Sequence, residues 1–420
     1  MKKVLALVLA FMMLLCACAV AETSISTTAA EFDLTGDPSA LKVGVILIGD
    51  ENEGYTMAHI TGIKEAAAAL GMTEDQIIWK YSIPEDASCL EAIYDCLDSG
   101  CNVIISNSYG HQTHTQQAAI EYTGEPIQFI AMTGDTANAS GLTNFSNAFT
   151  KVYESRYVSG VVAGMKLAEM VANDELTDDN FDENGNIKIG YVGAYPYAEV
   201  VSGYTAFFLG IRSIVPNVAM SVQYTNSWFD LIGEGEAANQ LLSIGCVIIG
   251  QHADSTGAPS AVQAARENGV NAYSVGYNID MLSVAPEAAL TSATNVWEVY
   301  YEYALKTAIN GDPIARNWAA GYEAGAVAIT DLGPSAAEGT AEKVEEVIAG
   351  LKDGSVKVFD VSTFTVGGEA VESAFATDTD GDFAPDADEA IIDGAYAESY
   401  YQSAPSFALR IDGITELNAN

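Results

Sequence analysis

The sequence between Val222 and Met281 contains three segments of one pattern, "VQYTNSWFD" (222–230), "CVIIGQHADS" (246–255) and "AYSVGYNIDM" (272–281). Each segment begins with an apolar run and ends in aromatic and hydrogen-bonding side chains. Short apolar runs separated by helical patterns are typical of buried parallel strands. Because open α/β sheets bind ligands at the carboxyl ends of their strands, we expect these polar ends to meet in one cleft. The residues expected there are Asn226, Trp228, Asp230, His252, Asp254, Tyr277, Asn278 and Asp280.

The same alternation extends to both sides of this stretch. Four apolar segments predict a first set of strands, separated by helical patterns, at residues 41–49, 76–81, 101–108 and 127–132. The alternation restarts at residues 187–195, after a long apolar helix expected over residues 153–172. In that helix Gly160 and Gly164 lie one turn apart, which would let it pack closely on a sheet. Two such sets predict an α/β fold with two doubly wound parallel-sheet lobes hinged around a cleft.

These patterns divide the chain into five parts. The parts are a signal segment (1–21), a linker (22–40), an N-terminal lobe (41–150) completed by about residues 285–330, a C-terminal lobe (151–284) and a C-terminal extension (331–420). In the extension we expect a helix over residues 336–352. The segment "VKVFDVSTFTV" (356–366) alternates apolar and polar residues, which predicts an antiparallel β-hairpin.

An acidic segment of the extension, "DTDGDFAPDADE" (378–389), resembles the start of a calcium-binding loop. Aspartates at i, i+2 and i+4 offer the oxygen ligands that calcium prefers, although the glycine stands at the fourth position and not at the sixth, as in an EF-hand. The alternative is an acidic turn in solvent. The aspartates that would bind calcium are Asp378, Asp380, Asp382, Asp386 and Asp388. No other cofactor is expected.

The charge of the chain limits its partners. With 57 acidic and 17 basic side chains, the formal net charge is −40. Such a surface repels phosphate backbones, so nucleic-acid binding is excluded as a function. The simplest interpretation of the acidity is solubility outside the cell. We expect the protein to be a monomer.

The first twenty residues form an export signal. Lys2 and Lys3 precede the apolar run "VLALVLAFMMLL" (4–15). The sequence "LCAC" (15–18) fits a lipoprotein signal with Cys18 as the lipidated residue, whereas "AVA" (19–21) fits ordinary secretion. We favour the lipid anchor, which would hold the protein at the extracytoplasmic face of the cell membrane. No later apolar run reaches the ~20 residues that a membrane-spanning helix needs.

Neither the cysteines nor the known catalytic motifs indicate an enzyme. The four cysteines after the signal lack the spacing of a zinc site. We expect buried free thiols, with a Cys89–Cys101 disulfide as the alternative, at Cys89, Cys96, Cys101 and Cys246. The chain contains no nucleophile elbow, HExxH motif or P-loop. His252 and Asp254 could form an acid–base pair, but no nucleophile accompanies them, so a ligand-binding or buried structural role suits them better.

Aromatic residues gather at the predicted strand ends and not on helix faces. Flat rings beside Asp, Asn and Ser acceptors suit a planar, polar ligand that stacks and forms hydrogen bonds at its edge. The alternative is ordinary core packing. The rings expected to line the pocket are Tyr55, Tyr109, Tyr195, Tyr197, Trp228 and Tyr277.

Several motifs in a fixed order make the chain recognisable. They are "GYTMAHITGIKEA" (54–66), "IISNSYG" (104–110), "NAFTKVYESRYVSGVVAG" (147–164), "IGYVGAYPYAEVVSGYTAFFLGIRS" (189–213), "NSWFD" (226–230), "GQHADS" (250–255), "GYNIDM" (276–281) and "ALTSATNVWEVYY" (289–301). From about Lys42 to Thr330 the sequence resembles the basic membrane protein (BMP) family of substrate-binding proteins, which includes purine nucleoside receptor lipoproteins. The resemblance implies a type 1 periplasmic-binding-protein fold with three hinge strands, and delivery of a purine nucleoside or nucleobase to an ABC permease.

The resemblance also implies roles for individual residues. Tyr55 and Tyr109 match aromatic positions of the first lobe. Trp228 with Asp230, and His252 with Asp254, match stretches of the nucleobase-binding branch, and Asp280 matches the second acid of a strand-end motif. Asn278 stands where nucleoside receptors carry an aspartate that holds the ribose hydroxyls, which favours a free purine base.

We therefore predict an extracytoplasmic substrate-binding protein of an ABC importer that binds a purine base or nucleoside between its lobes. Two other functions stay open. The first is a receptor that binds a sugar or a signal and feeds a sensor. The second is an extracellular nucleoside hydrolase, for which Asp378–Asp382 supply the one metal-like cluster. The resemblance gives no role for the extension after about Val356.

Overall fold

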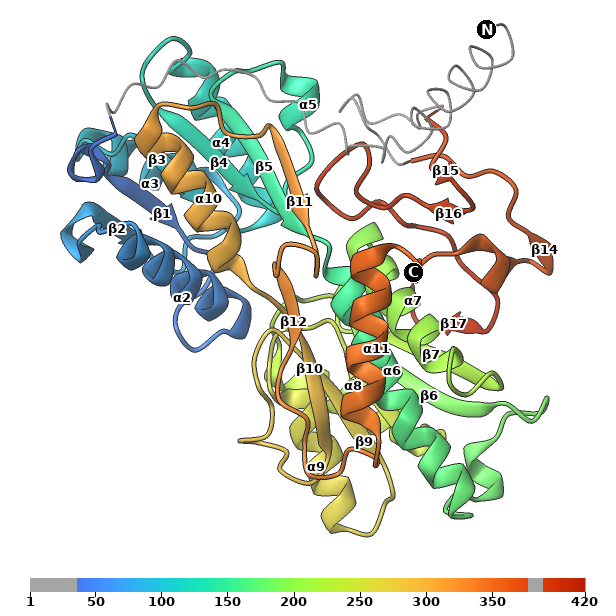
Figure 1. The fold of residues 1–420 in the computed structure, drawn as a ribbon. Helices are drawn as coiled ribbons and strands as arrows, with labels where there is room; N and C mark the ends of the chain where they lie inside the picture. Colours follow the sequence, from blue (N-terminus) through green and yellow to red (C-terminus); the bar gives the residue numbers. More distant parts are fainter. Residues whose placement is uncertain (1–35, 377–387, 420) are drawn as a thin grey trace, which may run out of the picture.

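The computed structural model describes residues 36–376 and 388–419. It contains two α/β lobes and a C-terminal extension that lies against both of them (Figure 1). The signal segment, with Cys18, lies outside the described residues, and so do four of the five candidate calcium ligands. Within the described residues, no helix has both the length and the apolar character needed to cross a membrane.

The first lobe is built on a parallel sheet of six strands in the order β11-β5-β4-β3-β1-β2. The strands are β1 (Val43–Ile46), β2 (Ile77–Lys80), β3 (Val103–Ser106), β4 (Gln128–Met132), β5 (Phe145–Thr150) and β11 (Asn317–Ala320). Helices cover both faces because the strands are apolar on both sides. One core contains α2 (Gly54–Ala69) and α10 (Trp297–Asn310), and the other contains α3 (Ala87–Asp98) and α4 (Gln112–Glu121). A short helix, α5 (Ala137–Ser140), precedes β5.

The second lobe is built on a sheet of seven strands in the order β12-β10-β9-β8-β6-β7-β17, parallel except at β12. The strands are β6 (Ile187–Gly193), β7 (Val218–Tyr224), β8 (Ile248–Gln251), β9 (Tyr273–Tyr277), β10 (Ala289–Asn295), β12 (Val327–Ile329) and β17 (Ile414–Glu416). One face is covered by α6 (Val152–Ala172), α7 (Ala198–Arg212) and α11 (Thr340–Asp353). The other face is covered by α8 (Leu231–Ser243) and α9 (Gly257–Glu267). The prediction of two doubly wound parallel-sheet lobes is confirmed.

Glycines bring α6 and α7 into close contact. A Cβ atom on Gly160 would lie 2.2 Å from the Phe207 carbonyl oxygen, and one on Gly210 would lie 2.2 Å from the Tyr157 carbonyl oxygen. A Cβ on Gly164 would also press on α7, at 3.0 Å from the Ile211 carbonyl oxygen. The expected close packing of these glycines on a sheet is therefore wrong, because they face a neighbouring helix.

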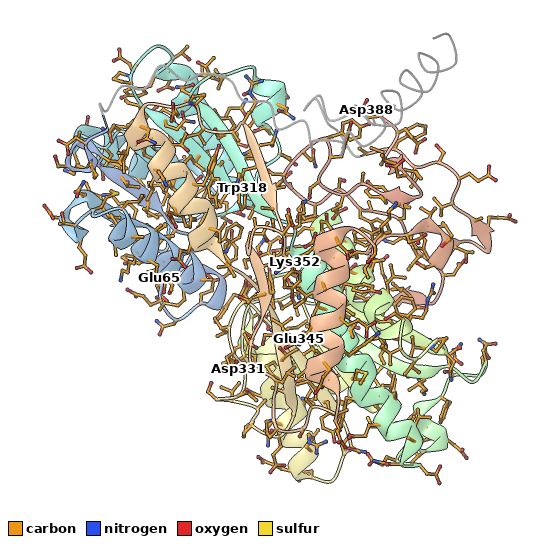
Figure 2. The ribbon with its side chains drawn as sticks, in the orientation of Figure 1. Glu65, Trp318, Asp331, Glu345, Lys352 and Asp388 are labelled. Atoms are coloured by element: carbon orange, nitrogen blue, oxygen red, sulfur yellow. The ribbon has the colours of Figure 1, made fainter. Side chains whose placement is uncertain are left out.

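The chain passes between the two sheets three times. It leaves the first lobe after β5, returns after β10 into α10, and leaves again after β11 toward β12. At the crossing the Thr150 hydroxyl donates a hydrogen bond to the Asn295 side chain. We expected the first lobe to be completed from about residue 285, but β10 pairs with β9 in the second sheet. The return therefore begins with α10, whose Tyr300 ring packs 5.0 Å from that of Trp318 on β11. Figure 2 labels Trp318 in the first lobe.

The extension is not the single hairpin predicted over residues 356–366. Asp360 caps a short 3₁₀ turn by accepting a hydrogen bond from the Ser362 backbone, which ends the extended run early. Two short antiparallel pairs follow. They are β13 (Thr365–Val366) with β14 (Glu369–Ala370), and β15 (Ile391–Ile392) with β16 (Ala395–Tyr396). The last strand, β17, joins the edge of the second sheet in parallel to β7.

The extension contacts both lobes (Figure 1). Its Phe359 and Phe407 rings stack at 4.3 Å in the core of the second lobe. In the first lobe, Asn138 donates a hydrogen bond to the Tyr401 carbonyl at 2.8 Å. The four described cysteines lie in the cores of the lobes as buried free thiols, so the structure holds no Cys89–Cys101 bridge.

Candidate ligand-binding site

A cavity of about 440 Å³ lies between the two lobes. That volume is in the range of small-molecule sites. The first lobe contributes Ile48, Gly49, Asp50, Asn52, Glu53, Tyr55, Ser82, Ser108, Tyr109 and Thr133. The second lobe contributes Glu199, Trp228, Phe229, Asp254 and Tyr277.

The cavity lies where the parallel strands of both sheets end. In the first lobe its lining residues follow β1, β2, β3 and β4, and in the second lobe they follow β6, β7 and β8 or end β9. This is the edge at which open α/β sheets bind ligands. The segments 222–230, 246–255 and 272–281 therefore deliver Trp228, Asp254 and Tyr277 to one site, as their shared pattern predicts.

Left-handed backbone conformations mark these strand ends. Ser82, Thr133, Asn226 and Asn278 have φ angles of 52°, 62°, 55° and 62°. Each follows a strand directly or within two residues, and two of them line the cavity. For residues other than glycine this conformation costs about 1–2 kcal/mol, and it persists where the surroundings enforce it. The sharp bends let the chain leave each strand and still present side chains to the cavity.

Aromatic rings form much of the cavity wall. Tyr55 and Tyr109 stand on the first lobe, opposite Trp228 and Tyr277 on the second. Tyr195 is not a lining residue, but its ring lies edge-on to Trp228 at 5.2 Å and so supports that ring from behind. Tyr197 stacks in turn on Tyr195 at 5.0 Å.

The polar part of the lining is acidic. Four of the described lining residues carry carboxyl groups, namely Asp50, Glu53, Glu199 and Asp254, and none is basic. An ionised carboxylate only accepts hydrogen bonds, and a protonated carboxyl group keeps an acceptor oxygen while it donates its O–H. The cavity is therefore suited to a ligand that presents N–H or O–H donors, and it repels a phosphate.

Asp254 is held in place by its neighbours. Its backbone N–H donates to the Trp228 carbonyl at 2.8 Å, and its Oδ1 accepts from Asn278 Nδ2 at 2.7 Å. Burial raises the pKa of Asp254 well above its ordinary value, and the charges of Glu53 and Glu199 raise it further. Asn278 is buried behind Asp254, so it holds a lining carboxyl and does not itself line the cavity.

Glu199 and His252 form a second polar pair. Glu199 Oε1 lies 3.3 Å from His252 Nε2, and the histidine is fully buried. Burial lowers the pKa of His252, as does the charge of Arg156, so the imidazole is neutral and donates its Nε2–H to the carboxylate. Burial raises the pKa of Glu199 to about 7, with the positive charge of Arg156 acting in the opposite direction.

Glu53 and Tyr55 are fixed by the start of α2. Glu53 caps the helix by accepting a hydrogen bond from the Thr56 backbone at 3.2 Å, and burial raises the pKa of its carboxyl. The Tyr55 hydroxyl donates to the Asn107 carbonyl, which holds the ring against the end of β3. The N-terminus of α2 therefore places the Glu53 carboxyl group and the Tyr55 ring at the cavity.

The structure does not bring every expected residue to the cavity. Asp230 caps α8 by accepting hydrogen bonds from the backbone of Ile232 and Gly233, at 3.2 and 2.9 Å. Asp280 is exposed and caps the next turn through the Leu282 N–H at 2.8 Å. Asn226 is likewise absent from the lining. His252 lies behind the wall and reaches the cavity through Glu199.

Sequence reasoning missed several lining residues, among them Asp50, Glu53, Glu199 and Thr133. Glu53 is the N-cap of α2 and Glu199 stands in the first turn of α7, and this position at the start of a helix that follows a strand was the signal that could have identified them. Thr133 had no such signal, because its place in the lining depends on its left-handed backbone. Within residues 36–376 and 388–419 no group of three or more His, Cys, Asp or Glu side chains is arranged to hold a metal ion. Calcium binding by the acidic segment stays a prediction, since only Asp388 of its five aspartates is described.

Comparison with known proteins gives one family. Residues 42–356 match the Bmp family, described as ABC transporter substrate-binding protein PnrA-like. A purine-binding protein of Brucella abortus is 31% identical over 337 residues, covering 79% of this chain and 87% of that protein. A putative ABC transporter glucose-binding protein of Haloferax volcanii is 28% identical over 362 residues, covering 84% and 83%.

Solved structures agree on the fold. A solute-binding protein of an ABC transporter system from Aeropyrum pernix superposes with a TM-score of 0.62 at 16% identity, covering 76% of this chain and 93% of that one. A solute-binding protein from Conexibacter woesei gives a TM-score of 0.59 at 19% identity, covering 76% and 98%. At this identity the likeness concerns the arrangement of the lobes alone.

Proposed function

The chain belongs to the Bmp family of ABC transporter substrate-binding proteins, and we propose that the ligand it captures is a purine. The observation that carries the proposal is the chemistry of the cavity. Flat rings on opposite lobes offer stacking faces to a planar ligand, and four carboxyl groups offer acceptors to its edge. A purine base has both a planar π system and N–H donors at its edge.

We propose the free base as the preferred form of the purine. Nucleotides are disfavoured because their phosphate would enter a cavity whose described lining carries four acids and no base. Asn278 stands where nucleoside receptors of this family carry an aspartate for the ribose, and here it holds Asp254 in place. The Brucella relative, whose name says that it binds purines, supports the ligand class.

A sugar is the second candidate. The Haloferax relative is named as a putative glucose-binding protein, and aromatic faces with carboxylate acceptors also suit sugar hydroxyls. The hydrolase alternative needs a nucleophile or activated water, and the described lining offers carboxyls without an arranged metal cluster. Release of hypoxanthine from inosine would support hydrolysis, and binding without product would argue against it.

The proposed mechanism is capture by closure of the lobes. The three crossings between the sheets would act as the hinge, and the closed form would be the one that docks on the ABC permease. We also propose that Cys18 carries the lipid anchor and that the protein acts as a monomer. A Cys18→Ser variant should then appear in the medium and not in the membrane fraction. Retention of that variant in membranes would contradict the anchor.

A thermal-shift screen of the chain from about Thr23 tests the ligand class. Any ligand of the native state raises the melting temperature by mass action. The probes are adenine, guanine, hypoxanthine, xanthine, their nucleosides, adenosine monophosphate and several sugars. We expect bases to raise the melting temperature and the nucleotide to have no effect. Shifts with nucleosides alone would contradict the preference for a base, and shifts with sugars alone would overturn the purine proposal.

A further inference from the structure

A buried arginine lies behind the second-lobe wall of the cavity. Arg156 stands on α6, four residues after its first residue, and its side chain is among the largest that are fully buried. Its Cζ lies 3.6 Å from the centre of the Tyr277 ring. Its Nη1 donates to the Gln251 carbonyl at 2.5 Å, at the end of β8. The guanidinium therefore joins α6 to the two strand ends that carry His252 and Tyr277.

This charge has no conventional partner. Among the described residues, no carboxylate lies within ion-pair distance of Arg156, and its Nε and Nη2 make no well-formed hydrogen bond. Burying a charge without a close counter-ion costs several kcal/mol in protein interiors. A fold retains such a group only if other interactions offset the cost. Two carboxyl groups of the cavity in front of it, Glu199 and Asp254, lie in the field of the guanidinium.

The groups around Glu199 identify Arg156 as the source of positive charge there. Several ionisable side chains interact electrostatically with Glu199. They are Tyr55 from α2, Arg156 from α6, Tyr191 from β6, His252 and Asp254 from the end of β8, and Tyr277 from β9. Of these described groups, His252 is neutral and Arg156 is the cation. The same positive charge opposes the protonation of Asp254.

We propose that Arg156 is a positioning residue for ligand binding, whose buried guanidinium supplies positive charge behind Glu199 and His252 and holds the Tyr277 ring at the cavity wall. The inference rests on the proposed function. It adds to that function a role for Glu199, as the carboxyl group that accepts a hydrogen bond from an N–H of the bound purine. Arg156 itself does not line the cavity, so it acts through Glu199 and Tyr277.

The proposal predicts a particular pH dependence. Glu199 accepts a hydrogen bond more strongly when it is deprotonated, and burial places its pKa at about 7 even with Arg156 present. Ligand affinity should therefore rise as the pH is raised through 7 and level off above it. Without the positive charge the pKa of Glu199 rises further, so the midpoint should move to higher pH by about one unit or more. A purely structural role would lower affinity equally at all pH values.

The chain offers a matched control for the substitution. Arg266 also lies over a tyrosine ring, with its Cζ 4.1 Å from the centre of Tyr273, and it also donates to a backbone carbonyl, that of Ala272 at 3.1 Å. Tyr273 begins the strand that Tyr277 ends, so Arg266 lies at the far end of β9 from the cavity. Arg266→Gln therefore removes the same kinds of interaction, a ring contact and a hydrogen bond to a carbonyl, without removing charge from the cavity.

The test is isothermal titration of the chain from Thr23 with adenine, which stays neutral over the range used, between about pH 5.5 and about 8.5. We expect the affinity of the wild type to rise about tenfold across this range, with a midpoint near the pKa of Glu199. Arg156→Gln should bind about threefold more weakly at pH 7 and recover at high pH, and Arg156→Lys should keep the wild-type midpoint. Arg266→Gln should match the wild type. Glu199→Gln should lose the part of the pH dependence whose midpoint lies near the pKa of Glu199.

A ligand-free measurement separates this inference from the proposed function. Carbon-13 NMR titration of the glutamate carboxyl groups follows Glu199 directly, with Glu199→Gln identifying its signal. An upward move of that titration in Arg156→Gln, and not in Arg266→Gln, supports the inference whether or not adenine binds. An unchanged titration in Arg156→Gln, or an equal loss of affinity at every pH, overturns it. Absence of adenine binding by the wild type at every pH overturns the purine proposal alone. If Arg156→Gln does not fold, the carbon-13 titration of Glu199 is measured in Arg156→Lys, again with Glu199→Gln identifying the signal. A titration midpoint in Arg156→Lys that differs from that of the wild type overturns the inference.

Discussion

Glu398 should make the folded protein less stable as the pH rises. It lies in the extension, it is 2% exposed, and it accepts a hydrogen bond from the Phe407 backbone at 2.7 Å. Burial raises the pKa of its carboxyl from 4.5 to about 8, against the opposing effect of hydrogen bonds from Ser202 and the Phe407 backbone. Between those two values the folded state holds a proton that the unfolded state has released. Stability is therefore lost as the pH rises through that window.

Replacing Glu398 by glutamine removes this dependence. The two pKa values differ by 8 − 4.5, or about 3.5. At ~1.4 kcal/mol per pH unit, ionisation weakens the folded state by up to about 3.5 kcal/mol between pH 5 and pH 8, most of the total. Relaxation around the charge reduces this, so we expect about 2 kcal/mol. The glutamine oxygen can still accept the hydrogen bond from Phe407.

Urea unfolding of the ligand-free chain at pH 5 and at pH 8 measures the effect. Glu398→Gln should be close to wild type at pH 5 and more stable than wild type by about 2 kcal/mol at pH 8. Glu372→Gln removes an exposed carboxyl of the same extension and controls for the change in net charge. The reasoning is refuted if the difference between Glu398→Gln and wild type is the same at both pH values, or if Glu372→Gln behaves identically.

Four further substitutions test other parts of the structure. Trp228→Ala should cost about 1–3 kcal/mol of purine binding by titration calorimetry, as loss of a stacked ring does, with little change in melting temperature. Gly210→Ala places a Cβ 2.2 Å from a carbonyl oxygen of α6 and should cost about 1–3 kcal/mol of stability, whereas Gly235→Ala, with its nearest atom at 3.5 Å, should be tolerated. Asn138→Ala removes the hydrogen bond from the first lobe to the extension and should cost about 1 kcal/mol in urea unfolding. Gly54→Val would press on the second lobe, where a Cβ already lies 3.4 Å from a backbone oxygen, and should weaken binding more than stability; tighter binding would contradict this.

The sequence predicts the layers of this fold better than its boundaries. Apolar runs and helical spacing identify most strands, because strands buried on both faces must be apolar throughout. They do not say which strand is the neighbour of which. The sequence predicts that the segment of β10 returns to the first lobe, but β10 pairs with β9 in the second sheet. The partner of a strand depends on the packing of the whole sheet, which a local pattern does not contain. In the extension, alternation over residues 356–366 predicts a strand, but the cap at Asp360 turns the chain first.

At a strand end, the residue type predicts a place in the cavity lining only where the side chain is not already bonded to the local backbone. Trp228, Asp254 and Tyr277 reach the cavity as expected. Asp230 does not, because its carboxyl group caps α8 by accepting hydrogen bonds from backbone N–H groups of the first turn. Its position directly before Leu231, where the helix begins, was the sequence signal for that role. Arg156 stands in an apolar helix face, and its link to the cavity depends on contacts with two strands distant in sequence.

The placement of the cavity acids also explains why ligand and closure should be coupled. Glu53 lies on the first lobe, whereas Glu199 and Asp254 lie on the second, and the charges of Glu53 and Glu199 both raise the pKa of Asp254. Bringing the lobes together without a ligand therefore brings like charges together in a partly desolvated space, which opposes closure. A ligand with N–H donors on its edge gives these carboxyl groups hydrogen bonds in place of mutual repulsion. On the proposed function, such a ligand would bind the closed form better than the open one, which is the differential affinity that a ligand needs in order to shift the equilibrium between them.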